Sequence, residues 1–95
     1  MIIHYNTHTD KKIWYGARTI VVFHIGDCEP AESFKIADLI KNHIDSTIGT
    51  VFYLDWDFLA AQGTVRLESA MNCDLQTLRE ACNKIITLTH KTIQP

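Results

Sequence analysis

The chain begins with segments in which hydrophobic and polar residues follow the two-residue period of β-strands. Residues 2–7 have strand composition, and the polar residues 8–12 after them predict a turn. Residues 13–15 and 18–25 resume the strand pattern on either side of Gly16. The second of these segments is β-branched or aromatic on both alternating faces, which predicts a central strand that is covered on both sides.

Two later segments carry hydrophobic residues three and four positions apart, the spacing of an amphipathic helix. The first spans residues 31–45 after Pro30, which fits the first position of a helix because its missing N–H is not needed there. The second follows Asp74, a residue type that caps helix N-termini. The stripe of the first helix comprises Ile36, Leu39, Ile40 and Ile44, and that of the second Leu75, Leu78, Cys82 and Ile85.

Between the two helices, residues 50–59 and 64–69 alternate cleanly and predict a hairpin joined by residues 60–63. One face of its first strand is aromatic and apolar, whereas the other carries acidic residues. The first face comprises Phe52, Leu54, Trp56 and Phe58, and the second Val51, Tyr53, Asp55 and Asp57. We expect the aromatic face, Trp56 included, to pack against the helices.

A four-residue loop sets a register in which Asp57 faces Arg66 and Asp55 faces Glu68. The first pair is a favourable cross-strand ion pair. The second brings like charges together, which destabilises a sheet unless a cation or a partner offsets the repulsion. In this register, Glu68→Lys is expected to stabilise the hairpin.

The predicted order β(β)αββα describes an α+β protein built as a two-layer sandwich. An antiparallel-rich sheet with both helices on one face would bury both apolar stripes. This order resembles a split βαβ, ferredoxin-like arrangement in which the N-terminal strand replaces the usual last one. No repeat, low-complexity run or Pro/Gly-rich linker divides the sequence, so we predict a single domain over residues 1–95. The resemblance concerns element order alone and assigns no function.

Charge and composition narrow the classes of function. Nine basic and eleven acidic residues give a net charge of −2, so the basic footprint of a nucleic-acid-binding protein is missing. No apolar stretch approaches the roughly 18 residues of a membrane span, and the N-terminus lacks the features of a signal peptide. Cys28, Cys73 and Cys82 form no CxxC pair and are expected to be reduced, structural thiols. We therefore expect a cytoplasmic protein without a nucleic-acid or membrane partner.

The sequence contains no motif of a nucleophile elbow, a P-loop, a dinucleotide-binding turn or a zinc protease helix. His4 and His8 would stand about 13 Å apart on a strand, too far to share one ion. His24 would form a dyad with an aspartate of the hairpin only if their strands were neighbours. We therefore expect no catalytic residue, no metal ligand and no cofactor, and we favour a protein that is not an enzyme.

The best indication of function is apolar surface on the sheet face that the helices would leave open, unless the N-terminal segment folds over it. An apolar centre with a charged rim is typical of a protein interface. Our first hypothesis is a small, non-enzymatic interaction or regulatory module, expected to form a homodimer, that binds a protein partner through this face. The predicted partner-binding residues are Ile20, Val22, Val51, Tyr53, Asp55, Asp57, Arg66 and Glu68.

Other interpretations use the same face. The carboxylates of Asp55, Asp57 and Glu68, together with His24, could hold a small ligand or a divalent metal and support hydrolysis. Stacking of nucleic-acid bases on Tyr53 and His24 is disfavoured by the net charge. The remaining interpretation is a solvated face whose long side chains splay apart and bind nothing.

Overall fold

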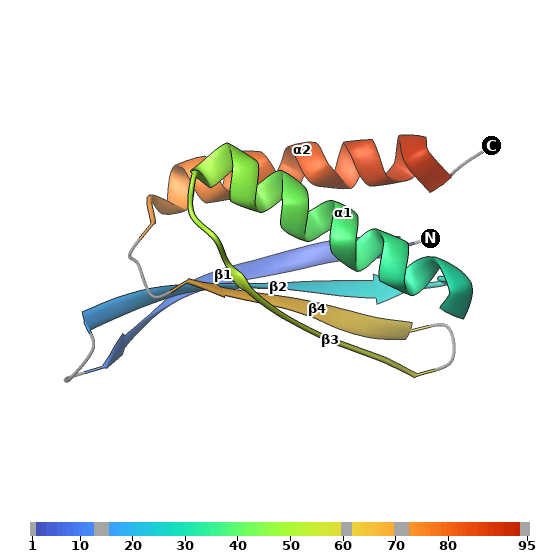
Figure 1. Ribbon diagram of the computed structural model, residues 1–95, viewed down its shortest axis with the longest axis horizontal. Helices are drawn as coiled ribbons and strands as arrows, with labels where there is room; N and C mark the ends of the chain where they lie inside the picture. Colours follow the sequence, from blue (N-terminus) through green and yellow to red (C-terminus); the bar gives the residue numbers. More distant parts are fainter. Residues whose placement is uncertain (1, 13–15, 60–61, 70–72, 94–95) are drawn as a thin grey trace.

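The computed structural model describes residues 2–12, 16–59, 62–69 and 73–93, which form a four-stranded sheet and two helices that cover one of its faces (Figure 1). In chain order the elements are β1 (Ile2–Lys12), β2 (Gly16–Gly26), α1 (Pro30–Ile48), β3 (Tyr53–Leu59), β4 (Gln62–Ser69) and α2 (Leu75–Ile93). The predicted two-layer α+β class is confirmed. Neither helix, within the described ranges, is long and apolar enough to cross a membrane.

The strands lie in the order β1-β2-β4-β3, and each pair of neighbours is antiparallel. As a consequence, β2 and β3 run parallel to each other on either side of β4 and are joined through α1. This is the split βαβ connection that the element order predicts. β1 lies on the other side of β2, the place that a strand after the second helix takes in the ferredoxin-like arrangement. The predicted replacement of that strand by the N-terminal one is confirmed.

The first hairpin extends further than the polarity of its residues predicts. Residues 8–12, expected to form a turn, belong to β1, which stays paired with β2 as far as Lys12 opposite Gly16. Gly16 therefore begins a strand instead of interrupting one. The predicted strand at residues 13–15 falls outside the described residues. An edge strand pairs through its backbone and tolerates polar side chains, so the polarity of residues 8–12 did not indicate a turn.

The hydrophobic core lies between the helix-facing side of the sheet and the two helices. The two central strands supply side chains that are completely buried: Val21, Phe23, Val65 and Leu67. The helices supply a second buried set of at most 1% exposure: Ile36, Ile40, Ile44, Leu78, Cys82 and Ile85. Both predicted stripes therefore face the sheet, although Leu39 and Leu75 at their margins are only partly buried.

All three cysteines are free thiols, as the sequence predicts. Cys28 and Cys82 are buried, and Cys73 is half-buried. Burial raises the pKa of the Cys82 thiol to about 12 and also raises the pKa of Cys28. Both buried thiols are therefore protonated and act as small hydrophobic side chains.

The end of α1 determines where β3 can begin. Gly49 adopts a left-handed φ of 79° and donates its N–H to the carbonyl oxygen of Asp45 at 2.8 Å. A carboxylate oxygen of Asp45 accepts a hydrogen bond from the backbone N–H of Phe52 at 2.9 Å. This bond holds the connection against the helix, so β3 begins at Tyr53 rather than at residue 50, and Val51 lies before the strand.

Asp74 caps α2, as its position predicts. Its carboxylate accepts hydrogen bonds from the hydroxyl of Thr77 at 2.7 Å and from the backbone N–H of the same residue at 3.2 Å. These two bonds lower the pKa of Asp74. The folded-state pKa is therefore below the unfolded-state value, so this contribution to stability is complete above the ordinary pKa and is lost as the pH falls through the folded-state pKa.

We expect Asp74→Ala to be less stable than the wild type at pH 6 and the difference to disappear as the pH falls below the folded-state pKa of Asp74. Urea unfolding across this range measures both. Thr77→Val, which keeps the backbone N–H but loses the hydroxyl, should show a smaller loss with the same pH dependence. A stability difference that is constant with pH would contradict the capping role.

Gly63 is required by the close approach of the two strands of the second hairpin. It lies opposite Phe58, whose ring occupies the space above it. A Cβ at Gly63 would meet this ring and stand 2.5 Å from the carbonyl oxygen of Asp57. By contrast, a Cβ at Gly26 would find its nearest neighbour, the Cβ of Ile2, at 3.9 Å, an ordinary van der Waals contact.

Gly63→Ala is therefore expected to lower the free energy of unfolding by about 1–3 kcal/mol, the usual cost of overpacking. Gly26→Ala is the matched control and should change it by no more than about 0.5 kcal/mol. Equilibrium urea denaturation of both variants decides the matter. Equal losses in the two would show that the Phe58 ring does not need the space above Gly63.

Candidate functional site

The second face of the sheet carries side chains from all four strands, and no segment of the described chain covers it (Figure 1). The N-terminal segment extends the sheet as β1 instead of folding over this face, and Ile3 and Tyr5 point to the helix side, where Ile3 joins the core and Tyr5 packs against it. Cross-strand neighbours on this face form two rows. Read from β1 to β3, the first row is His4, His24, Thr64 and Asp57, and the second is Asn6, Val22, Arg66 and Asp55.

All the predicted partner-binding residues except Val51 lie on this face, but its centre is not the exposed apolar surface that we expected. Ile20 is only 2% exposed, and Val22 is half-buried. Their cross-strand neighbours on β4 are Glu68 and Arg66, which form an ion pair at 3.0 Å. Because the aliphatic stems of these long side chains lie beside the two apolar residues, the centre of the face presents charged groups.

The register of the second hairpin differs from the prediction by two residues. Asp55 lies opposite Arg66, Asp57 opposite Thr64, and Tyr53 opposite Glu68. Because β4 already begins at Gln62, residues 62 and 63 belong to the strand and not to the predicted loop. A shift of two residues keeps each side chain on its predicted face but changes its partner. The predicted repulsion between Asp55 and Glu68 is therefore wrong.

The carboxylates of the hairpin do not converge on one point. Glu68 bonds to Arg66, and Asp55 lies directly opposite the same arginine. Asp55 and Asp57 are exposed. The described residues contain no group of three His, Cys, Asp or Glu side chains that could hold a metal ion. Geometry therefore gives no support to the divalent-metal interpretation of Asp55, Asp57 and Glu68.

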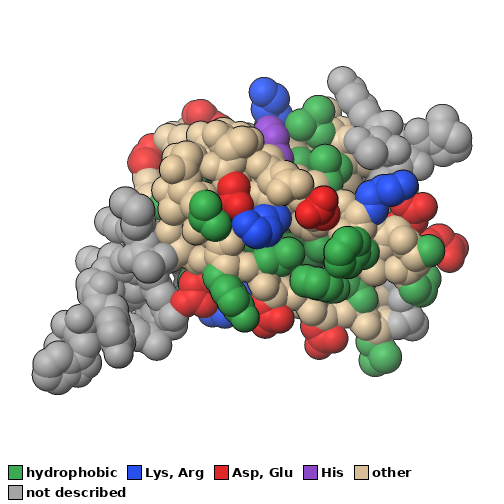
Figure 2. Space-filling model, viewed as in Figure 1, with side chains coloured by type: hydrophobic (Ala, Val, Ile, Leu, Met, Phe, Trp, Pro, Cys, Tyr) green, Lys and Arg blue, Asp and Glu red, His purple; other side chains and the backbone are tan. Residues whose placement is uncertain are grey.

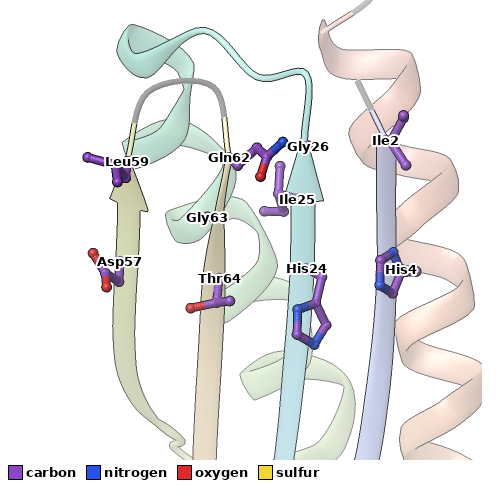
Figure 3. Close-up of a pocket in the computed structure, with 10 residues that line it drawn as sticks. All are labelled: Ile2, His4, His24, Ile25, Gly26, Asp57, Leu59, Gln62, Gly63 and Thr64. Atoms are coloured by element: carbon purple, nitrogen blue, oxygen red, sulfur yellow. The ribbon is translucent and has the colours of Figure 1, made fainter.

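A shallow hollow of about 520 Å³ lies at one end of the uncovered face (Figure 3). His4 and His24 stack there, with ring centroids 5.0 Å apart and planes inclined by 16°. Their nitrogen lone pairs lie in these nearly parallel planes, so they do not point at a common ion. β4 separates His24 from Asp57 by two strand spacings, about 9–10 Å, so the two side chains form no catalytic dyad.

Exposed hydrophobic side chains instead gather along β3, the last strand of the sheet. Six large hydrophobic residues of the described chain are exposed, and five of them belong to this region. We call the region the β3 edge; its members are Val51 (81% exposed), Tyr53 (72%), Leu59 (84%), Trp56 (42%) and Phe34 (65%). Figure 2 shows hydrophobic side chains grouped on the side of the molecule where Figure 1 places β3 and α1.

Part of this region was not predicted from the sequence. We expected Trp56 in the core, yet it is 42% exposed because β3 has a neighbour on one side only. Its ring contacts Phe34 of α1 edge to face, with centroids 5.6 Å apart. Phe34 lies outside the buried stripe of its helix, and an aromatic residue on an otherwise polar helix face was the signal that could have revealed it.

The backbone of β3 is also available on its outer side. Among the described residues, β4 is the only strand that pairs with β3. Alternate N–H and C=O groups of such an edge strand point outwards without a partner in the sheet, which makes the edge a template for another strand. The β3 edge thus combines free backbone groups, apolar side chains and two exposed aspartates.

Comparison with known proteins gives no further guidance to this site. No protein-family model matches the chain, and neither a curated protein nor a solved structure matches it significantly.

The observed register reverses the expected effect of one substitution. Glu68→Lys removes the ion pair with Arg66 and places a second positive charge beside it. We therefore expect Glu68→Lys to lower the free energy of unfolding by about 0.2–1 kcal/mol, the range of a partly exposed ion pair, here within one strand. Glu68→Gln removes the attraction without adding repulsion and should cost less. Thermal unfolding in low salt measures both, and a Glu68→Lys protein that melts above the wild type would restore the original register.

Proposed function

We propose that this chain is a small, non-enzymatic interaction or regulatory module that binds a protein partner through the uncovered sheet face, chiefly at the β3 edge. The observation that carries the proposal is the collection of five exposed hydrophobic side chains around one edge strand. Isolated hydrophobic residues on a surface are ordinary, whereas apolar side chains gathered along one edge and accompanied by charges are typical of an interface.

The energetics of this group support the same function. Complete burial of one large apolar side chain contributes about 1.5–3 kcal/mol relative to exposure. Tyr53 and Leu59, which are largely exposed, and the exposed part of Trp56 could therefore offset part of the cost of association, about 4–15 kcal/mol. Tyr and Trp are also the residue types that most often dominate binding energy in protein interfaces.

The polar groups on the face fit binding better than catalysis. His24 and Asp57 are held apart by β4, and Glu68 is engaged with Arg66. We place this function in the cytoplasm, in keeping with the free thiols. The homodimer expected from the sequence stays a prediction.

The proposal is tested by replacing Tyr53 with the photocrosslinking residue p-benzoylphenylalanine in host cells. We expect irradiation to give a discrete adduct with another protein, measured as a mass shift on a denaturing gel and identified by mass spectrometry. The same replacement at Gln76, exposed on α2, is the matched control and should give no such adduct. An absence of adducts at Tyr53, or the same adducts at both positions, would contradict the proposal.

A further inference from the structure

We infer that the partner contributes an extended strand that pairs with the outer edge of β3 and carries lysine or arginine at every second position. This inference rests on the proposed function and specifies the chemistry of the partner. It follows from the free edge, from the charges on one face of β3 and from the aromatic residues on the other.

The charge of the partner follows from two aspartates on the uncovered face. Asp55 and Asp57 are two positions apart, so both point the same way from β3. In an added strand, the residues directly opposite them would be two positions apart and on the same face. The described part of the chain contains no ion pair to either carboxylate. Basic side chains in these two places would form attractive pairs, whereas acidic ones would be repelled.

The apolar positions of the partner follow from the other face of β3. Trp56 lies between the two aspartates in the sequence and points to the helix side, where it contacts Phe34. A residue of the added strand opposite Trp56 would meet these exposed rings. The complementary strand therefore alternates basic and apolar residues, and its backbone bonds supply a second, sequence-independent contribution.

The same charges disfavour a second copy of this chain as the occupant. Antiparallel pairing of two β3 strands places side chains of the same face opposite each other. A two-fold axis centred at residue 55, 56 or 57 then brings an aspartate opposite an aspartate. Axes centred at any other residue of β3 (Tyr53–Leu59) pair at most three of its residues. Every extensive antiparallel β3–β3 pairing about a two-fold axis is therefore repulsive, which is a common protection of edge strands.

The test uses three kinds of labelled eight-residue peptide. The first alternates lysine with valine, and the second has glutamate in place of lysine. The third is the lysine peptide with N-methylated backbone amides at alternate residues. It is made in two frames, one methylated at the lysines and the other at the valines. Fluorescence anisotropy gives the dissociation constants, and NMR of the protein amides locates the binding. We expect the lysine peptide to bind about tenfold tighter or more than the glutamate peptide, because two attractive cross-strand pairs replace two repulsive ones.

Protein variants identify the groups responsible. In Asp55→Asn/Asp57→Asn the preference for lysine over glutamate should fall to about twofold. Asp38→Asn/Glu80→Gln removes two exposed charges from the helices and should keep the full preference. N-methylation in the frame that faces β3 should weaken binding about tenfold or more, because it removes the backbone donors.

Several results would overturn the inference. Equal binding of the lysine and glutamate peptides would refute charge selection, and equal binding of both N-methylated frames and the parent would refute strand addition. Amide shifts confined to β1 would place binding at the wrong edge. Self-association of the wild type through β3, seen by sedimentation and lost on Leu59→Asp, would make a second copy the occupant. If Tyr53 crosslinks a partner but no lysine peptide binds, the proposed function stands and this inference fails.

Discussion

The burial of one face of β2 and β4 beneath both helices is the interaction on which the rest of the structure depends. Val21 and Phe23 on β2 and Val65 and Leu67 on β4 have no exposed surface. Each such residue contributes about 1.5–3 kcal/mol relative to exposure. Because both helices are needed to cover this one face, the opposite face and the flanking strand β3 remain available. The exposed surface is thus a direct result of how the core is built.

The types of the elements and their layers could be predicted because each depends on spacing alone. The stripe of Ile36, Ile40 and Ile44 identifies a helix and its buried face without reference to any other element. The register of the second hairpin depends on the connection, and here the prediction was wrong. Gly63 reads as a loop residue, yet it belongs to β4 and lies under the Phe58 ring. The predicted faces survived, because a shift of two residues preserves the alternation.

The candidate site could be predicted only where it depends on local alternation. Tyr53, Asp55 and Asp57 point away from the helices, as their spacing indicates. The burial of Ile20 and the exposure of Trp56 depend instead on which strands are central and which lie at the edge. That order is set by pairing between residues far apart in the chain, such as Thr19 with Ser69, and is not readable from local pattern.

The position of β4 between β2 and β3 has a consequence for the order in which the sheet assembles. β1 and β2 follow each other directly in the chain, whereas paired residues of β2 and β4 are 38 to 50 positions apart, so the pairing of β2 with β4 carries a larger entropic cost. β3 reaches the sheet only through β4, so it joins no earlier than β4 does. The same connectivity makes β3 a strand that can open without disturbing β2. Its amides should therefore exchange with solvent through local openings that leave the core intact, while those of β2 and β4 exchange through unfolding of the whole sheet.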